Sequence, residues 1–127
     1  MFKNLEMFQA SYAMARHSGA RQAVTAANMA NADTPGYRAR SLAPFAESYS
    51  ADMDSHLRTT RAQHLTTGPV AGASSIQISD AEASPNGNSV SLEQEMVNSV
   101  EIQREHNRAL AIYKHSLDVL RLSIGRK

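Results

Sequence analysis

The stretch that decides the fold of this chain is Ala27-Asn-Met-Ala-Asn-Ala-Asp-Thr-Pro-Gly-Tyr37. A helix built largely of small residues runs into it and ends at Pro35 and Gly36, because proline cannot continue a helix and glycine favours turns. Asn28 and Asn31 are three residues apart, so they lie on one face of that helix. Their amides suit a close contact with another helix better than they suit catalysis.

Proline and glycine divide the chain into a helix, an irregular middle and a second helix. All four prolines lie between residues 35 and 85, and proline breaks helix interiors. We therefore expect a first helix over about residues 3–32, within an N-terminal region 1–33. Its residues recur at spacings of three or four and form one stripe. The stripe begins with the bulky Leu5, Phe8 and Tyr12 and continues with the small Ala15, Gly19, Ala23, Ala26 and Ala30.

The last helix is expected to begin at Ser91 and to occupy residues 91–127. Ser91 and Gln94 fit the S-x-x-Q capping box, and Glu93 and Glu95 suit the positive end of the helix dipole. Its stripe consists of Leu92, Met96, Val100, Gln103, Asn107, Leu110, Tyr113, Leu117, Leu120 and Ile124.

Neither terminal helix can bury its stripe alone. The predicted fold is therefore all-α and forms one unit, residues 1–127. Its long N- and C-terminal helices pair as an antiparallel coiled-coil-like hairpin, and an irregular middle, residues 34–90, joins them. Uncovered surface would remain on both helices, which predicts further partners.

The middle of the chain carries only short structural signals. Residues 43–53 are compatible with a short helix, and alternation over residues 74–79, with Ile76 and Ile78 on one face, predicts a strand. The run Pro85-Asn-Gly-Asn88 predicts a turn, because Asn-Gly favours positive φ. We expect an extended loop or a small hairpin here.

Composition excludes several functional classes. The formal net charge of +1 does not indicate a nucleic-acid or membrane-surface protein. Cysteine is absent, which excludes disulfides, thiolate catalysis and cysteine-based zinc sites. No stretch approaches the roughly 18 apolar residues of a membrane-spanning helix. Polar residues from Asn4 to Ser11 interrupt any apolar signal region, so no cleaved signal peptide is expected.

No arrangement of residues predicts catalysis, a cofactor or a metal ion. The five histidines are His17, His56, His64, His106 and His115, and none belongs to a pattern typical of metal ligands. The paired acids at 52 and 54 and at 80 and 82 lie in Ser/Ala-rich sequence typical of a surface. We therefore expect no enzyme, with no catalytic, cofactor-binding or metal-binding residue.

The opening stretch closely resembles the N-terminal motif A-N-x-A-N-x-x-T-P-G-Y of bacterial flagellar rod, hook and hook-associated axial proteins. Three further runs resemble the proximal rod subunits of the basal body. They are Tyr37-Arg-Ala-Arg40, Thr59-Thr-Arg-Ala-Gln-His-Leu65 and Asn86-Gly-Asn-Ser-Val-Ser-Leu-Glu-Gln-Glu-Met96. Hook and distal-rod relatives insert large β-domains between their terminal helices, whereas this chain looks like a minimal proximal rod protein.

The resemblance implies a structural part of the rod that transmits torque and continues the export channel. Such subunits are exported by the flagellar type III apparatus and stack in the periplasm, where their terminal helices form the inner tube. The implied partners are other rod proteins, further copies of the chain, and the junction with the basal-body ring and export gate. The implied assembly motif is Asn28, Asn31, Thr34, Pro35, Gly36 and Tyr37.

We hypothesise that the terminal helices fold fully only on assembly, because their stripes lack partners in a free chain. Leu110, Leu117 and Leu120 would then seal the pair within the chain, and the small face around Ala23, Ala26 and Ala30 would meet neighbours. The expected helix-packing residues are Leu5, Phe8, Tyr12, Met96, Val100, Leu110, Tyr113, Leu117 and Leu120.

Two alternatives stay open at this point. One is a related short rod subunit, which differs in the neighbour that it binds. The other is a cytoplasmic helical-hairpin adaptor or export chaperone that binds a partner protein.

Overall fold

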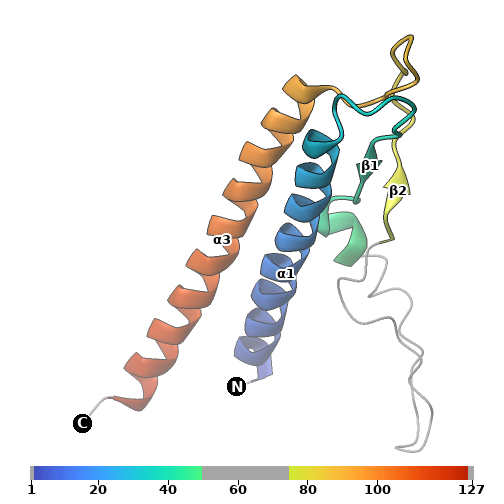
Figure 1. Cartoon of the computed structure of the whole chain (residues 1–127). Helices are drawn as coiled ribbons and strands as arrows, with labels where there is room; N and C mark the ends of the chain where they lie inside the picture. Colours follow the sequence, from blue (N-terminus) through green and yellow to red (C-terminus); the bar gives the residue numbers. More distant parts are fainter. Residues whose placement is uncertain (1, 50–74, 126–127) are drawn as a thin grey trace, which may run out of the picture.

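The computed structural model describes residues 2–49 and 75–125, and the side chains of α1 from Glu6 onward. Two long helices, α1 (Phe2–Ala30) and α3 (Leu92–Ile124), lie antiparallel, so both chain ends are at the same end of the pair (Figure 1). The prediction of an all-α fold with an irregular middle is confirmed. The predicted bounds of the first helix agree with α1 to within two residues.

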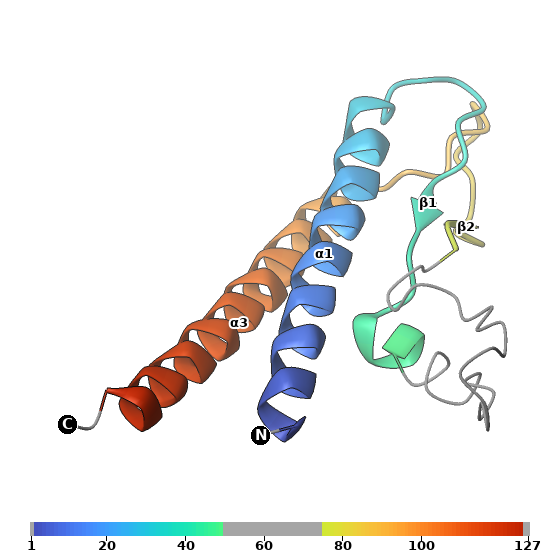
Figure 2. The ribbon, with the colours of Figure 1, turned by 90° about the horizontal axis from the view of Figure 1, so that it is seen from below.

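A short antiparallel ribbon lies on the side of α1 that faces away from α3 (Figure 2). Strand β1 (Arg40–Ser41) pairs with β2 (Gln77–Ile78), with Arg40 opposite Ile78. The amide of Ser79 continues the ladder by donating to the Ala39 carbonyl at 2.8 Å. The strand predicted over residues 74–79 is therefore present at 77–78, whereas the sequence carried no signal for its partner.

A helical segment at residues 45–49 packs beside α1. Its Phe45 ring meets the His17 ring edge-on, with ring centres 5.6 Å apart. It coincides with part of the short helix expected over residues 43–53, of which residues 50–53 lie outside the described part of the chain.

Helix α3 begins with only half of the expected capping box. Ser91 has extended backbone (φ −100°, ψ 114°), and its hydroxyl accepts from the Gln94 amide at 3.4 Å. The Gln94 side chain does not reach back to the cap, because its amide donates to Asn98 at 3.2 Å. At the other end, the Gly125 amide donates to the Arg121 carbonyl at 2.7 Å and closes the last turn.

The seam between the two helices is formed by small and polar residues. On α1 the buried positions Ser11, Ser18 and Thr25 follow one another at intervals of seven residues. On α3 the buried residues keep the same interval, which is the heptad spacing of coiled coils. They are Glu95, Ile102, Ala109 and Ser116.

This seam differs from the stripes expected from the sequence. In the isolated chain Met96 is 56% exposed, Val100 52% and Leu110 49%, so Leu110 does not seal the helix pair. The expected stripe on α3 runs through its bulkiest apolar residues, whereas the seam uses a face of small side chains and hydrogen-bonding groups that is rotated away from them. Among the described residues, the buried hydrophobic ones are only Ala13, Ala39, Ile102 and Ala109.

Candidate assembly site at the helix ends

Asn28 joins three elements where α1 approaches the start of α3. Its side chain is 1% exposed, and its Nδ2 donates to the Arg40 carbonyl at 2.7 Å and to Glu95 Oε1 at 3.1 Å. Its Oδ1 accepts from the Arg40 amide at 3.0 Å and from the Tyr37 hydroxyl at 3.4 Å. The Asn28 side chain therefore bonds both backbone groups of Arg40, as a neighbouring strand would, and also links α1 to α3.

Asn31 lies on the same face of α1 but makes local bonds. Its Nδ2 donates to the Ala27 carbonyl at 2.7 Å, and its Oδ1 accepts from the Thr34 hydroxyl at 3.3 Å. The two asparagines of the motif are therefore brought to one helix end, where only Asn28 reaches across to α3.

The turn after α1 follows from Pro35 and Gly36. The Tyr37 amide donates to the Thr34 carbonyl at 3.3 Å, and Gly36 has φ +72°. Proline at the second position and a glycine with positive φ at the third are typical of a type II turn. This turn carries Tyr37 back toward Asn28, as the hydrogen bond between them shows.

A second glycine turn packs against the first. The Gly36 amide donates to the Asn86 carbonyl at 3.0 Å, and Gly87 has φ +80°. A Cβ added at Gly87 would lie 3.3 Å from the Gly36 Cα, so the two backbones approach too closely for a side chain to fit without a shift. The turn predicted at residues 85–88 therefore serves as the contact surface for the Pro35-Gly36 turn.

Asn88, in the segment before α3, holds the turn that follows α1. Its Nδ2 donates to the carbonyls of Asn31 at 2.9 Å, Ala32 at 2.8 Å and Thr34 at 2.8 Å. Its Oδ1 accepts from the Val90 amide at 2.7 Å. These carbonyls lie in the turn that follows α1, outside the helical hydrogen-bond ladder, and Asn88 supplies a side-chain donor for them. Sequence reasoning placed Asn88 in a turn and missed this role.

Ser89 completes the joint between the two halves of the chain. Its hydroxyl accepts from the Ala39 amide at 2.9 Å, and its own amide donates to the Tyr37 carbonyl at 3.1 Å. We call the segments 28–41 and 84–95, which these bonds connect, the helix-end joint. Five of the six predicted motif residues make bonds in it; Pro35 contributes the shape of its turn.

The predicted helix-packing residues lie in different environments. Phe8 and Tyr113 meet edge-on across the pair, with ring centres 5.3 Å apart. Tyr12 is exposed, with the Arg16 guanidinium carbon 5.9 Å from its ring centre. Leu117 and Leu120 are half-buried, and the Leu5 side chain lies outside the described ones.

Polar contacts reinforce the middle of the helix pair. Arg21 and Glu105 form an ion pair at 2.7 Å, and Gln22 donates to the Ser99 hydroxyl at 3.1 Å. Both contacts connect α1 to α3 in the same antiparallel register as the Asn28–Glu95 bond. Sequence reasoning did not single out these residues, because polar positions in a helix do not reveal which face they share with a partner.

His17 is buried where the 45–49 segment covers α1. Its Nε2 lies 3.4 Å from the Ser48 hydroxyl. Burial lowers the pKa of His17, and the nearby Arg21 cation lowers it further, whereas Glu105 and a bond with the Ala43 backbone act in the opposite direction. The histidine is therefore held in its neutral form below the pH at which it would ordinarily protonate.

This burial predicts acid sensitivity. The pKa of His17 is below 6.5 in the folded chain, so below that pH the unfolded chain binds more protons than the folded one. Stability should be unaffected above pH 6.5 and should fall as the pH drops from there toward the folded-state value. Thermal melting followed by circular dichroism at pH 7.5 and pH 5.5 tests this. His17→Gln should reduce the difference between the melting temperatures at the two pH values. An equal difference in the unsubstituted and the substituted chain would contradict the assignment of the acid sensitivity to His17.

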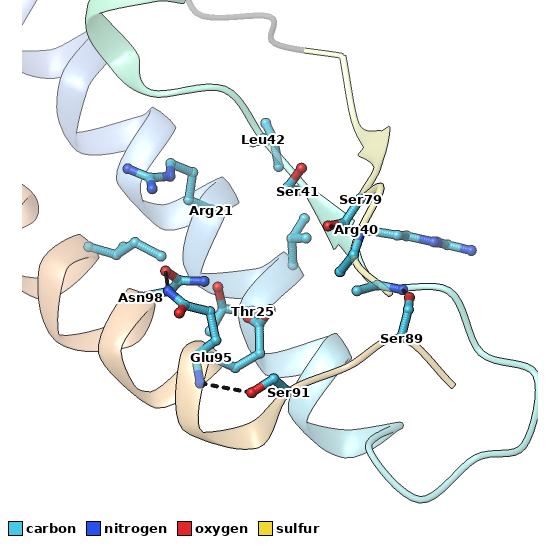
Figure 3. Close-up of a pocket in the computed structure, with 15 residues that line it drawn as sticks. Arg21, Thr25, Arg40, Ser41, Leu42, Ser79, Ser89, Ser91, Glu95 and Asn98 are labelled. Atoms are coloured by element: carbon cyan, nitrogen blue, oxygen red, sulfur yellow. Dashed lines mark hydrogen bonds between the residues drawn. The ribbon is translucent and has the colours of Figure 1, made fainter. Parts of the chain in front are cut away.

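A polar pocket of about 260 Å³ opens beside the helix-end joint (Figure 3). Its walls come from α1, from the chain around β1 and after β2, and from the first turns of α3. Arg21, Thr25, Leu42, Glu95 and Asn98 are among the residues that line it.

Within the described residues, no group of three or more His, Asp or Glu side chains is placed to hold a metal ion. His56 and His64, the acids at 52 and 54, and the run Thr59–Leu65 lie outside that part of the chain. Neither described helix has the apolar run that crossing a membrane requires.

Comparison with known proteins identifies a family that shares part of α1 and the turn after it. The profile of the family described as flagella basal body rod protein matches residues 13–38, which cover the second half of α1 and its turn. A flagellar basal body rod protein FlgB from Cereibacter sphaeroides is 30% identical over 105 residues, covering 82% of each chain. The FlgB of Agrobacterium fabrum is 26% identical over 129 aligned positions, covering 96% of this chain and 95% of its own length.

Proposed function

Because this chain belongs to the FlgB family of flagellar basal body rod proteins, it is a structural component of the proximal rod, and we propose that it assembles there through the outward faces of α1 and α3. The observation that carries this proposal is the division of side chains between the two faces of α3. Small and polar residues fill the seam within the chain, and large apolar residues remain outside it.

The outward face of α3 exposes apolar side chains and a shallow groove, as protein–protein interfaces do. Met96, Val97 and Val100 are exposed and line a shallow groove of about 340 Å³, with Glu101 and Arg104 at its edge. Further along the helix Leu110, Val119, Leu122 and Ile124 are exposed as well. Large apolar side chains left exposed in a groove mark association sites in soluble proteins. Neighbouring rod subunits would bury them.

The small residues of α1 supply a second surface. Gly19, Ala23, Ala26 and Ala30 are exposed, and their short side chains allow another backbone to approach closely. The proposed role of the helix-end joint is to set the geometry between these two surfaces. Asn28 and Asn88 tie the end of α1 to the start of α3, so every copy would present its two faces at the same angle.

We further propose that the chain reaches the periplasm through the flagellar type III apparatus and contacts the ring and export-gate junction. The small number of buried apolar residues in the described part of the chain supports a helix pair that is only marginally stable in the free chain and becomes fully ordered on assembly. Assembly would add the burial that the free chain lacks.

Substituting the groove residues tests the proposed function. Met96→Glu and Val100→Glu each place a charge in the outward groove but leave the seam untouched. A buried unpaired charge costs more than about 1.4 kcal/mol, so incorporation into basal bodies should fall by roughly tenfold or more. Immunoblots of basal bodies from a strain producing only the variant measure this, with motility as a second readout.

Ala83→Glu is the matched control, since Ala83 is exposed in the loop between β2 and α3, off the outward face of α3, and the same acid is introduced. It should assemble within about twofold of the unsubstituted chain, because an exposed charge remains hydrated. All three variants should melt similarly as purified chains. Normal assembly of both groove variants would overturn the proposed role of this face.

A further inference from the structure

Glu95 is a buried carboxylate with an incomplete set of partners. It is 7% exposed, lines the polar pocket, and receives a single side-chain hydrogen bond, from Asn28 to Oε1. Within residues 2–49 and 75–125, no lysine or arginine lies within ion-pair distance of it. A carboxylate can accept about four hydrogen bonds, so most of its capacity is free.

The neighbouring cations are already engaged or directed elsewhere. Arg21 lines the same pocket, but its guanidinium pairs with Glu105 at 2.7 Å. Arg40 is joined to Asn28 through its backbone, and its side chain extends away from Glu95 (Figure 3). The pocket therefore has an uncompensated negative charge in its wall.

A second group in the pocket has unused hydrogen-bonding capacity. Thr25 is 5% exposed in the same wall, and its hydroxyl makes no hydrogen bond within the described part of the chain. The volume of about 260 Å³ holds several water molecules at roughly 30 Å³ each, and so accommodates the end of one long side chain.

We propose that this pocket receives the lysine or arginine side chain of a neighbouring rod subunit, with Glu95 as its ionic partner. In the free chain, water that enters the pocket solvates the carboxylate. When a neighbour covers the pocket this water is lost, and a carboxylate left without a partner would oppose assembly. A cationic side chain restores both the charge balance and the hydrogen bonds. The proposal rests on the proposed function, because it requires a neighbouring subunit.

The charge requirement is tested by Glu95→Gln in cells that produce only the variant chain. Glutamine keeps an oxygen to accept from Asn28 but removes the negative charge. Glu93→Gln is the matched control, because it removes the same charge from an exposed position two residues earlier on α3. We expect the amount of chain in purified basal bodies to fall at least tenfold for Glu95→Gln and less than twofold for Glu93→Gln. Assembly of Glu95→Gln within twofold of the control would overturn the proposal.

Two further measurements distinguish a role of Glu95 in folding from its proposed role as the ionic partner of a neighbouring subunit. The purified Glu95→Gln chain should show the same circular dichroism melting curve as the unsubstituted chain; a lower melting temperature would instead assign Glu95 to folding. A benzoylphenylalanine photo-crosslinker at Asn98, in the pocket wall, should capture a neighbour's peptide that contains lysine or arginine. A captured peptide without either residue would contradict the proposal.

The groove variants keep this test distinct from that of the proposed function. If Val100→Glu blocks assembly and Glu95→Gln does not, the rod interface stands and the cation pocket fails. If Val100→Glu and Met96→Glu both assemble normally, the proposed interface itself fails.

Discussion

Asn28→Ala is expected to lower the free energy of unfolding by roughly 2–4 kcal/mol, because it leaves several polar groups without partners. The substitution removes the donor to the Arg40 carbonyl and to Glu95, and the acceptor for the Arg40 amide. Each buried group left unsatisfied costs about 1–3 kcal/mol, and water that reaches the exposed Arg40 reduces part of that cost. Urea unfolding of the purified chain, followed by circular dichroism at 10 °C, measures the change.

Asn31→Ala is the matched control for Asn28. It removes the same amide from the same helix face, but its bonds to Ala27 and Thr34 are exposed to solvent. Its effect should stay below about 1 kcal/mol, because water replaces the lost partners. Equal effects of the two substitutions would show that α1 is not tied to α3 through Asn28.

Asn88→Ala is expected to destabilise the chain by roughly 2–3 kcal/mol, because it removes the side-chain donor that holds the turn after α1. Three backbone carbonyls lose their side-chain donor, and the Val90 amide loses its acceptor. The melting temperature should fall, and hydrogen exchange at the Val90 amide should accelerate as the segment before α3 loosens.

Asn86→Ala provides the comparison for Asn88. Asn86 is exposed, and its side chain accepts one bond, from the Asn88 amide at 3.0 Å. Its side-chain loss should cost less than about 1 kcal/mol, since its backbone carbonyl still accepts from Gly36. An Asn88→Ala chain as stable as Asn86→Ala would mean that water satisfies the carbonyls of the turn after α1.

Much of the local structure could be predicted because the residues that cause it are close in sequence. Pro35 and Gly36 end α1 and set the turn, and Ser91 caps α3 through the Gln94 amide. Both effects depend on backbone geometry within four residues. The resemblance to axial proteins also follows from contiguous motifs, and the comparison with FlgB relatives agrees with it.

The choice of helix face could not be predicted in this way. Leu92, Met96 and Val100 form the most apolar path along α3, yet they are exposed and Glu95 and Ile102 face α1. Hydrophobicity ranks faces by their tendency to be buried, but it does not say whether the partner is the same chain or another. In a subunit of an assembly, one helix can carry a face that packs within its own chain and another face that packs against a neighbouring chain.

By itself, the sequence determined the two long helices, the breaks between them, the turn chemistry and the family, because each depends on neighbouring residues or on a continuous motif. Only the tertiary structure decided that Asn28 bonds Glu95 across 67 positions of the chain, that Asn88 holds the turn after α1, and that a polar pocket forms beside them. These contacts join segments that are distant in sequence. An asparagine carries the same donor and acceptor wherever it stands, so its partner exists only once the helices have packed.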